Sequence, residues 1–89
     1  MPLEVTPRAI DVLRRALDVG RMDPRRVGVR ISVLRGPRGD EVRTGFAEEP
    51  DPGEQIVEAG GVRLFVAADL VVRGATVDVA DEHDLLIVR

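Results

Sequence analysis

The strongest constraint on the fold is a change of hydrophobic period near residue 27. Before it, residues 6–20 have the pattern of one amphipathic helix. The apolar positions that recur there at three- and four-residue spacing are Ile10, Leu13 and Leu17. From Val27 onward the period is two, which is typical of β-strands. The sequence therefore predicts one N-terminal helix followed by a β-rich remainder.

The ends of this helix carry local signals. Thr6 is a suitable N-cap followed by proline, and Gly20 suits a left-handed C-cap. We expect the apolar helix face to pack on the clearest apolar strand face of the chain, which carries Val29, Ile31 and Val33.

Six short strands are expected after the helix. Their ranges are 27–34, 41–47, 55–58, 62–66, 75–79 and 84–89, and residues 67–73 are expected to form a helical turn. The first two strands read as a hairpin with Gly36–Gly39 at its tip. Most connections are too short for parallel crossovers. The predicted fold is a single domain over residues 1–89 of class α+β, mostly β.

Composition excludes several kinds of function. The chain has no cysteine, so it contains no disulfide, thiolate ligand or cysteine nucleophile. All 13 basic residues are arginine, which excludes Schiff-base chemistry on lysine. A net charge of −3 without a basic stripe, and only two aromatic residues, argue against nucleic-acid binding. No apolar run is long enough to span a membrane and no signal peptide is recognised, so we expect a cytoplasmic protein without membrane partners.

Several segments in order resemble the HesB-like family of A-type iron–sulfur carriers. They are residues 5–9 with the following helix, 28–32, 36, 48–50, 61–66 and 74–78. The resemblance covers nearly the whole chain. It implies a compact HesB-like β-sandwich with one N-terminal helix, in a family whose members often form dimers.

The chain departs from this family at the cluster ligands. The resemblance implies a cysteine near the turn after residue 33, and Leu34 occupies that place. It also implies a second cysteine pair after the last strand, where the given chain stops at Arg89. Leucine cannot ligate iron, so we interpret Leu34 as a vacated ligand position. With Arg35 and Arg38 it forms either a partner contact or an ordinary covered residue beside a turn.

Other polar groups are weaker candidates for sites. Asp81, His83 and Asp84 are competent metal ligands, but neighbours on a turn diverge, and a solvated turn is the simpler interpretation. His83 has no adjacent nucleophile to activate. The acidic loop 48–54 is interpreted as solvated rather than as a calcium loop. The Gly36–Gly39 turn could cradle a phosphate, but no helix follows it.

Two functions remain open at this stage. The first is a cysteine-less, non-enzymatic interaction or structural module that binds no cofactor and acts with a protein partner or as a homodimer. The second is a residual role in iron or iron–sulfur cluster biogenesis with non-cysteine or partner-supplied ligands. Iron content after anaerobic purification separates the two.

Overall fold

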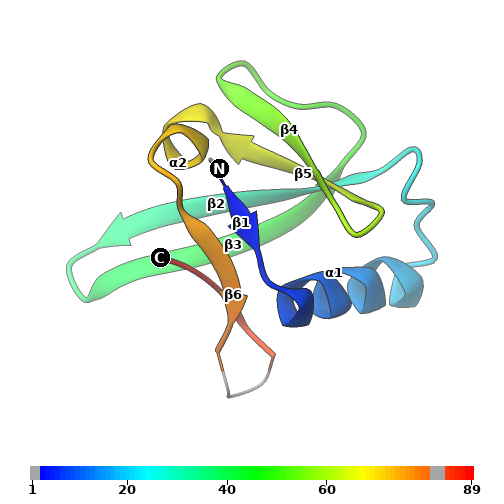
Figure 1. Ribbon diagram of the computed structural model, residues 1–89, viewed down its shortest axis with the longest axis horizontal. Coiled ribbons are helices and arrows are strands. Elements are labelled where there is room, and N and C mark those ends of the chain that lie inside the picture. The colour runs from blue at the N-terminus through cyan, green and yellow to red at the C-terminus, as the bar shows by residue number, and fades with distance from the viewer. Residues whose placement is uncertain (1–2, 81–83) are drawn as a thin grey trace.

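The structure is a computed structural model that describes residues 3–80 and 84–89. Within these residues it contains two helices and seven strands in two sheets (Figure 1). The sheets pack face to face, and the long helix α1 (Pro7–Val19) follows the first strand. The predicted class, α+β with mostly β structure and one N-terminal helix, is confirmed.

The larger sheet has the strand order β3-β2-β5-β4 and is built from two hairpins. Its strands are β2 (Gly28–Gly36), β3 (Gly39–Ala47), β4 (Glu54–Ala59) and β5 (Val62–Ala67). The predicted turn at the tip of the first hairpin is confirmed, since Gly36 pairs with Gly39. Gly60 and Gly61 connect the second hairpin with φ angles of 56° and 82°, as a type I′ turn requires.

The two hairpins are joined by a parallel pairing of β2 with β5. The paired residues are Val29 with Leu64, Arg30 with Phe65 and Ile31 with Val66. From the sequence, most connections were expected to be too short for parallel crossovers. Residues 37–61 provide one here, because they contain two whole strands and the loop between them.

The smaller sheet has the order β1-β6-β7, with β1 (Glu4–Val5), β6 (Thr76–Val79) and β7 (Leu86–Val88). β1 pairs parallel with β6, and β6 pairs antiparallel with β7. Strand β1 was not predicted from the sequence, because two residues are too few to show a period. The expected helical turn before β6 is present as α2 (Ala68–Val72).

Helix α1 begins as predicted and ends differently. The Ala9 N–H donates to Thr6 Oγ1 at 3.2 Å, and proline follows the cap. Gly20 is right-handed, with φ of −78°, so the expected left-handed glycine cap is wrong. Arg21 takes the left-handed conformation at φ of 54° instead, and the next N–H, of Met22, reaches back to the Leu17 carbonyl. This is a Schellman ending shifted by one residue.

The core lies between the two sheets and the buried side of α1. Its buried members include Ala9, Leu13, Leu17, Val29, Ile31, Leu64, Val66, Val77 and Val79. The helix lies mainly against β6 and β5, and it shares this core with the predicted face of β2. Ile10 is only partly buried, and the adjacent Ala9 is fully buried. The small alanine allows close approach of the helix, which the periodicity alone did not indicate.

Leu13→Ala tests the docking of α1. Leu13 is 2% exposed, so truncation removes buried apolar contacts and leaves a cavity, and we expect the free energy of unfolding to fall by about 2–5 kcal/mol. Urea melts measure this change. Arg14→Ala on the exposed side of the same helix is the control, with an expected change within about 0.5 kcal/mol. Equal stability of Leu13→Ala and the parent would contradict the packing described.

A polar contact fastens the start of α1 to β6. Thr6 Oγ1–H donates to Asp78 Oδ1 at 2.8 Å, while the same hydroxyl accepts the N-cap bond. The Val79 N–H also donates to Asp78 Oδ1, and the Arg89 guanidinium pairs with Oδ2. The Val79 N–H, the Thr6 hydroxyl and the arginine charge together hold the pKa of Asp78 below its ordinary value of 3.8.

Asp78→Asn tests this contact through its pH dependence. Because the native pKa is lowered, the carboxylate contributes stability above its unfolded pKa of 3.8 and loses it as pH falls through the native value. We expect Asp78→Asn to be less stable than the parent at neutral pH, and the difference to shrink below about pH 4. Denaturant melts at several pH values measure it, with Asp11→Asn as the charge-matched control. A difference that stayed constant down to low pH would refute the assignment.

Candidate functional site

The predicted ligand position lies near the tip of the β2–β3 hairpin. Leu34 pairs with Glu41, and 44% of its surface is exposed. Its side chain lies on the face of the larger sheet that also carries Arg30, which we call the outer face. Arg35 is on the opposite face and Arg38 is in the turn. The structure therefore does not gather Leu34, Arg35 and Arg38 on one surface, and their role as a joint partner contact stays a prediction.

The residues present do not fit an iron–sulfur cluster. The chain has no cysteine, and the leucine side chain has no lone pair to donate. Among residues 3–80 and 84–89, no group of three carboxylate or imidazole side chains is placed to hold a metal ion. These residues supply none of the soft anionic ligands that such a cluster takes.

The second candidate metal position is only partly visible. Asp81 and His83 lie outside the described residues. Asp84 has a φ of 53°, and its Oδ2 lies 3.3 Å from Nη2 of Arg15 on helix α1. Both side chains are largely exposed, so this ion pair adds little stability. It does direct the Asp84 carboxylate toward an arginine.

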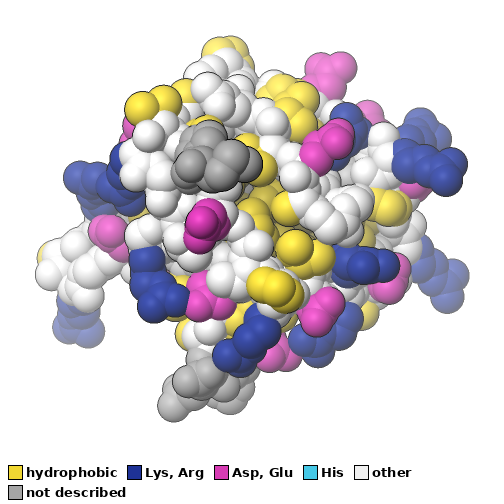
Figure 2. All heavy atoms as spheres, in the orientation of Figure 1, with side chains coloured by type: hydrophobic (Ala, Val, Ile, Leu, Met, Phe, Trp, Pro, Cys, Tyr) yellow, Lys and Arg dark blue, Asp and Glu magenta, His cyan; other side chains and the backbone are white. Residues whose placement is uncertain are grey.

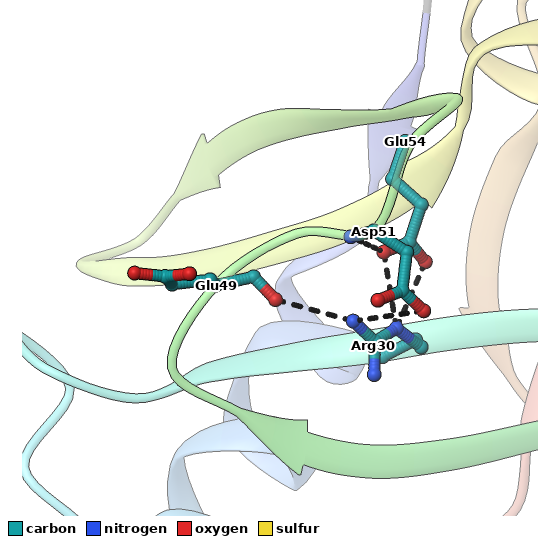
Figure 3. A network of polar contacts seen from close by, with 4 residues as sticks. All are labelled: Arg30, Glu49, Asp51 and Glu54. Carbon is teal, nitrogen blue, oxygen red and sulfur yellow. Dashed lines mark hydrogen bonds and ion pairs between the residues drawn. The ribbon is translucent and has the colours of Figure 1, made fainter.

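The acidic loop before β4 is anchored to the outer face by Arg30 (Figure 3). Arg30 Nε donates to both carboxylate oxygens of Glu54 at 3.0 Å, and its Nη2 donates to the Glu49 carbonyl at 3.2 Å. The same Nη2 lies 3.4 Å from Asp51 Oδ2, and the Asp51 N–H donates to Glu54 Oε1 at 2.7 Å. Glu54 is therefore neither solvated nor free for a cation, which corrects the interpretation of a wholly solvated loop.

A small apolar contact, separate from the main core, also lies on the outer face of the larger sheet. Phe65 is fully buried although it points away from the main core, beside Arg30 in the strand register. Its ring lies over Gly28, where a Cβ atom would come within 2.6 Å of the ring. Gly28 thus makes room for Phe65, and the Arg30 network holds the neighbouring loop in place.

Gly28→Ala tests this contact. The added methyl group would overlap the ring of buried Phe65, so we expect a loss of about 1–3 kcal/mol in the free energy of unfolding. Gly45→Ala on the adjacent strand is the matched control, because its Cβ would meet nothing within 4 Å. Thermal and urea melts of both variants measure the effect. Equal effects from the two substitutions would show that ring contact is not the reason for the glycine.

A hollow lies beside β3, between helix α1 and residues 84–87. Its volume is about 490 Å³. It is lined by parts of α1, β2 and β3 and by residues 80 and 84–87; the apolar lining residues are Val12, Leu13, Ala16, Val29, Val42, Phe46, Ala80, Leu85, Leu86 and Ile87. Figure 2 shows apolar side chains gathered near the middle of the visible face, bordered by arginines and carboxylates.

The polar lining of this hollow has no catalytic arrangement. It consists of Thr44 and three carboxylates, those of Asp40, Glu41 and Asp84. A threonine hydroxyl without a neighbouring base is a weak nucleophile. The hollow therefore offers apolar contact area to a binding partner, and its described side chains do not make an active site.

Comparison with known proteins places the fold. No model of a protein family matches the sequence, and no curated protein does. Solved structures do match. Escherichia coli SufA, described as involved in biosynthesis of iron–sulfur clusters, has a TM-score of 0.64 and 28% identity over 99% of this chain and 77% of that chain. IscA with a 2Fe–2S cluster has a TM-score of 0.64 and 28% identity, covering 98% of this chain and 81% of that one.

A third structure extends the likeness in shape. A protein of Aquifex aeolicus, solved by NMR, has a TM-score of 0.74 and 23% identity over 100% of this chain and 91% of that chain. Together these matches define the class, a two-sheet sandwich of the A-type carrier fold. The matches to SufA and IscA support the resemblance to the HesB-like family of A-type iron–sulfur carriers that the sequence indicated, and this chain has no cysteine.

Three features of this surface were not predicted from the sequence. The Arg30 network needs Glu54, which is 24 positions away, and nothing local signals that pairing. The buried position of Phe65 on the outer face had a faint signal in Gly28, a glycine inside a strand pattern. The hollow depends on how α1 and β7 sit against β3, which only the tertiary structure defines.

Proposed function

We propose that this chain is a non-enzymatic interaction module of the iron–sulfur biogenesis type, which binds protein partners and does not itself hold a cluster. The observation that carries the proposal is the combination of the A-type carrier fold with a chain that has no cysteine. A carrier fold without soft ligands has no means of its own to bind a cluster firmly.

The described surface supports a binding role over catalysis. The hollow beside β3 is mainly apolar, and the described residues around it place no base beside a nucleophile. Phe46 and Leu85 both line this hollow and are 44% and 59% exposed, so they offer apolar surface to a partner. No helix among the described residues is long and apolar enough to cross a membrane. A cytoplasmic location, a single domain over residues 1–89 and a homodimer belong to the same proposal.

Iron and sulfide content tests the proposal. Protein purified without oxygen and then supplied with ferrous iron and sulfide should show no visible charge-transfer band, because the chain offers no thiolate. After desalting we expect neither stoichiometric iron nor acid-labile sulfide. Leu34→Cys should not restore binding, because one thiolate per chain gives two in a dimer and a cluster takes about four.

The outcome that contradicts the proposal is equally defined. Stoichiometric iron with acid-labile sulfide, retained by the unmodified protein through desalting, would favour the residual carrier role with non-cysteine or partner-supplied ligands. Repeating the measurement with Asp84→Asn would then ask whether the segment that contains Asp81 and His83 takes part.

A further inference from the structure

Strand β3 is an edge strand of the larger sheet, and no other described strand pairs with its outer side. It has nine residues and pairs with β2 on one side only. It carries no proline, and its charged residues, Asp40, Glu41 and Arg43, are of both signs, so a partner strand can match them. An edge of this length is a ready template for an additional strand.

The strand register shows which backbone groups of β3 point outward. Gly36 and Gly39 flank a two-residue turn and exchange their hydrogen bonds as a pair. Because such pairs alternate along antiparallel strands, the N–H and C=O groups of the even-numbered residues from 40 to 46 point away from β2. The backbone hydrogen bonds recorded for the described residues outside the strand ladders and helices involve none of these groups.

These positions restrict how a second β3 could pair antiparallel with the first. Outward groups must meet outward groups, so even-numbered residues must face even-numbered residues of the partner. Centring the pairing on Glu41 or on Arg43 would bring like charges directly opposite each other, which is destabilising. Centring it on Thr44 would leave both charges opposite uncharged residues.

One register remains in which the side chains are complementary. Centred on Val42, it places Glu41 opposite Arg43 of the second copy, and Arg43 opposite its Glu41. These two ion pairs lie on the outer face at non-hydrogen-bonded positions, where side chains approach most closely. On the inner face, Val42 meets Val42 and Asp40 faces a threonine hydroxyl, that of Thr44.

We propose that a second copy of this chain pairs with β3 antiparallel in the register centred on Val42, joining two four-stranded sheets across a two-fold axis. The two-fold axis falls near the hairpin tip, while α1 lies toward the other end of β3 (Figure 1). Val42 also lines the hollow, so the pairing covers one wall of it in each copy. This deepens the interaction role proposed above and rests on it, by naming the partner and the surface.

Charge exchange tests the register. The parent should sediment as a dimer of the 9.7 kDa chain, while Arg43→Glu and Glu41→Arg should each weaken self-association roughly tenfold or more, since each puts like charges opposite. Mixing these two variants should restore a dimer, because the two glutamates on the strand of one copy then face two arginines of the other. Sedimentation equilibrium over a concentration series gives all four constants.

The mixture distinguishes pairing between chains from the ion pair within one chain. Arg43 Nε lies 3.8 Å from Glu41 Oε1 of its own chain, and both side chains are 66% exposed. Neither single variant can form that intrachain pair, so a recovered dimer in the mixture supports contact between chains. Circular dichroism of each variant confirms folding.

Two further variants locate the edge. Thr44→Pro removes an outward N–H without removing a bond to β2, and should abolish the dimer. Glu58→Arg makes the same change of charge as Glu41→Arg, but on β4, which is the other edge strand of this sheet. It should leave the dimer intact. A monomeric parent, a dimer lost only in Glu58→Arg, or a mixture that stays monomeric would each overturn the proposal. None of these outcomes bears on cluster binding, which the iron measurement decides separately.

Discussion

Two hairpins become one sheet because β2 pairs parallel with β5, and the rest of the structure depends on that pairing. It places Val29 and Ile31 beside Leu64 and Val66 on the inner face, where α1 and the smaller sheet cover them. On the outer face it places Arg30 beside Phe65, so the same three residue pairs build the core and the anchor of the acidic loop. A parallel pair of this kind is reached only after a long crossover, and its closure entropy must be offset by burial on both faces.

The two-sheet architecture of this chain does not depend on cysteine. A sandwich is stabilised by apolar burial between its sheets and by its strand ladders, and neither depends on a thiolate at the hairpin tip. Leu34 and the turn after it lie at the end of the β2–β3 hairpin, away from the buried core. A substitution at this exposed tip is therefore expected to have little effect on the packing of the core.

Two neighbouring features of the described surface suit a binding partner: the hollow beside β3 and the outer edge of β3 itself. The hollow beside β3 and the free edge of β3 adjoin, because Val42, Thr44 and Phe46 line the first and form part of the second. Apolar area next to unpaired backbone groups favours strand addition, since hydrogen bonds supply affinity and side-chain pairs supply register. Opposite charges two positions apart on the same face of β3 make that edge complementary to itself.

The sequence by itself determined the local elements: the Thr6 cap, the amphipathic helix, the first hairpin and the β-rich class follow from residue type and period, which act between near neighbours. It also determined the absence of thiolate chemistry in this chain. Only the tertiary structure decided the parallel pairings, the two-residue strand β1, the contact of Arg30 with Glu54 and the hollow beside β3. These depend on residues distant in the chain, whose contacts are selected by global packing and leave no periodic signal in a single sequence.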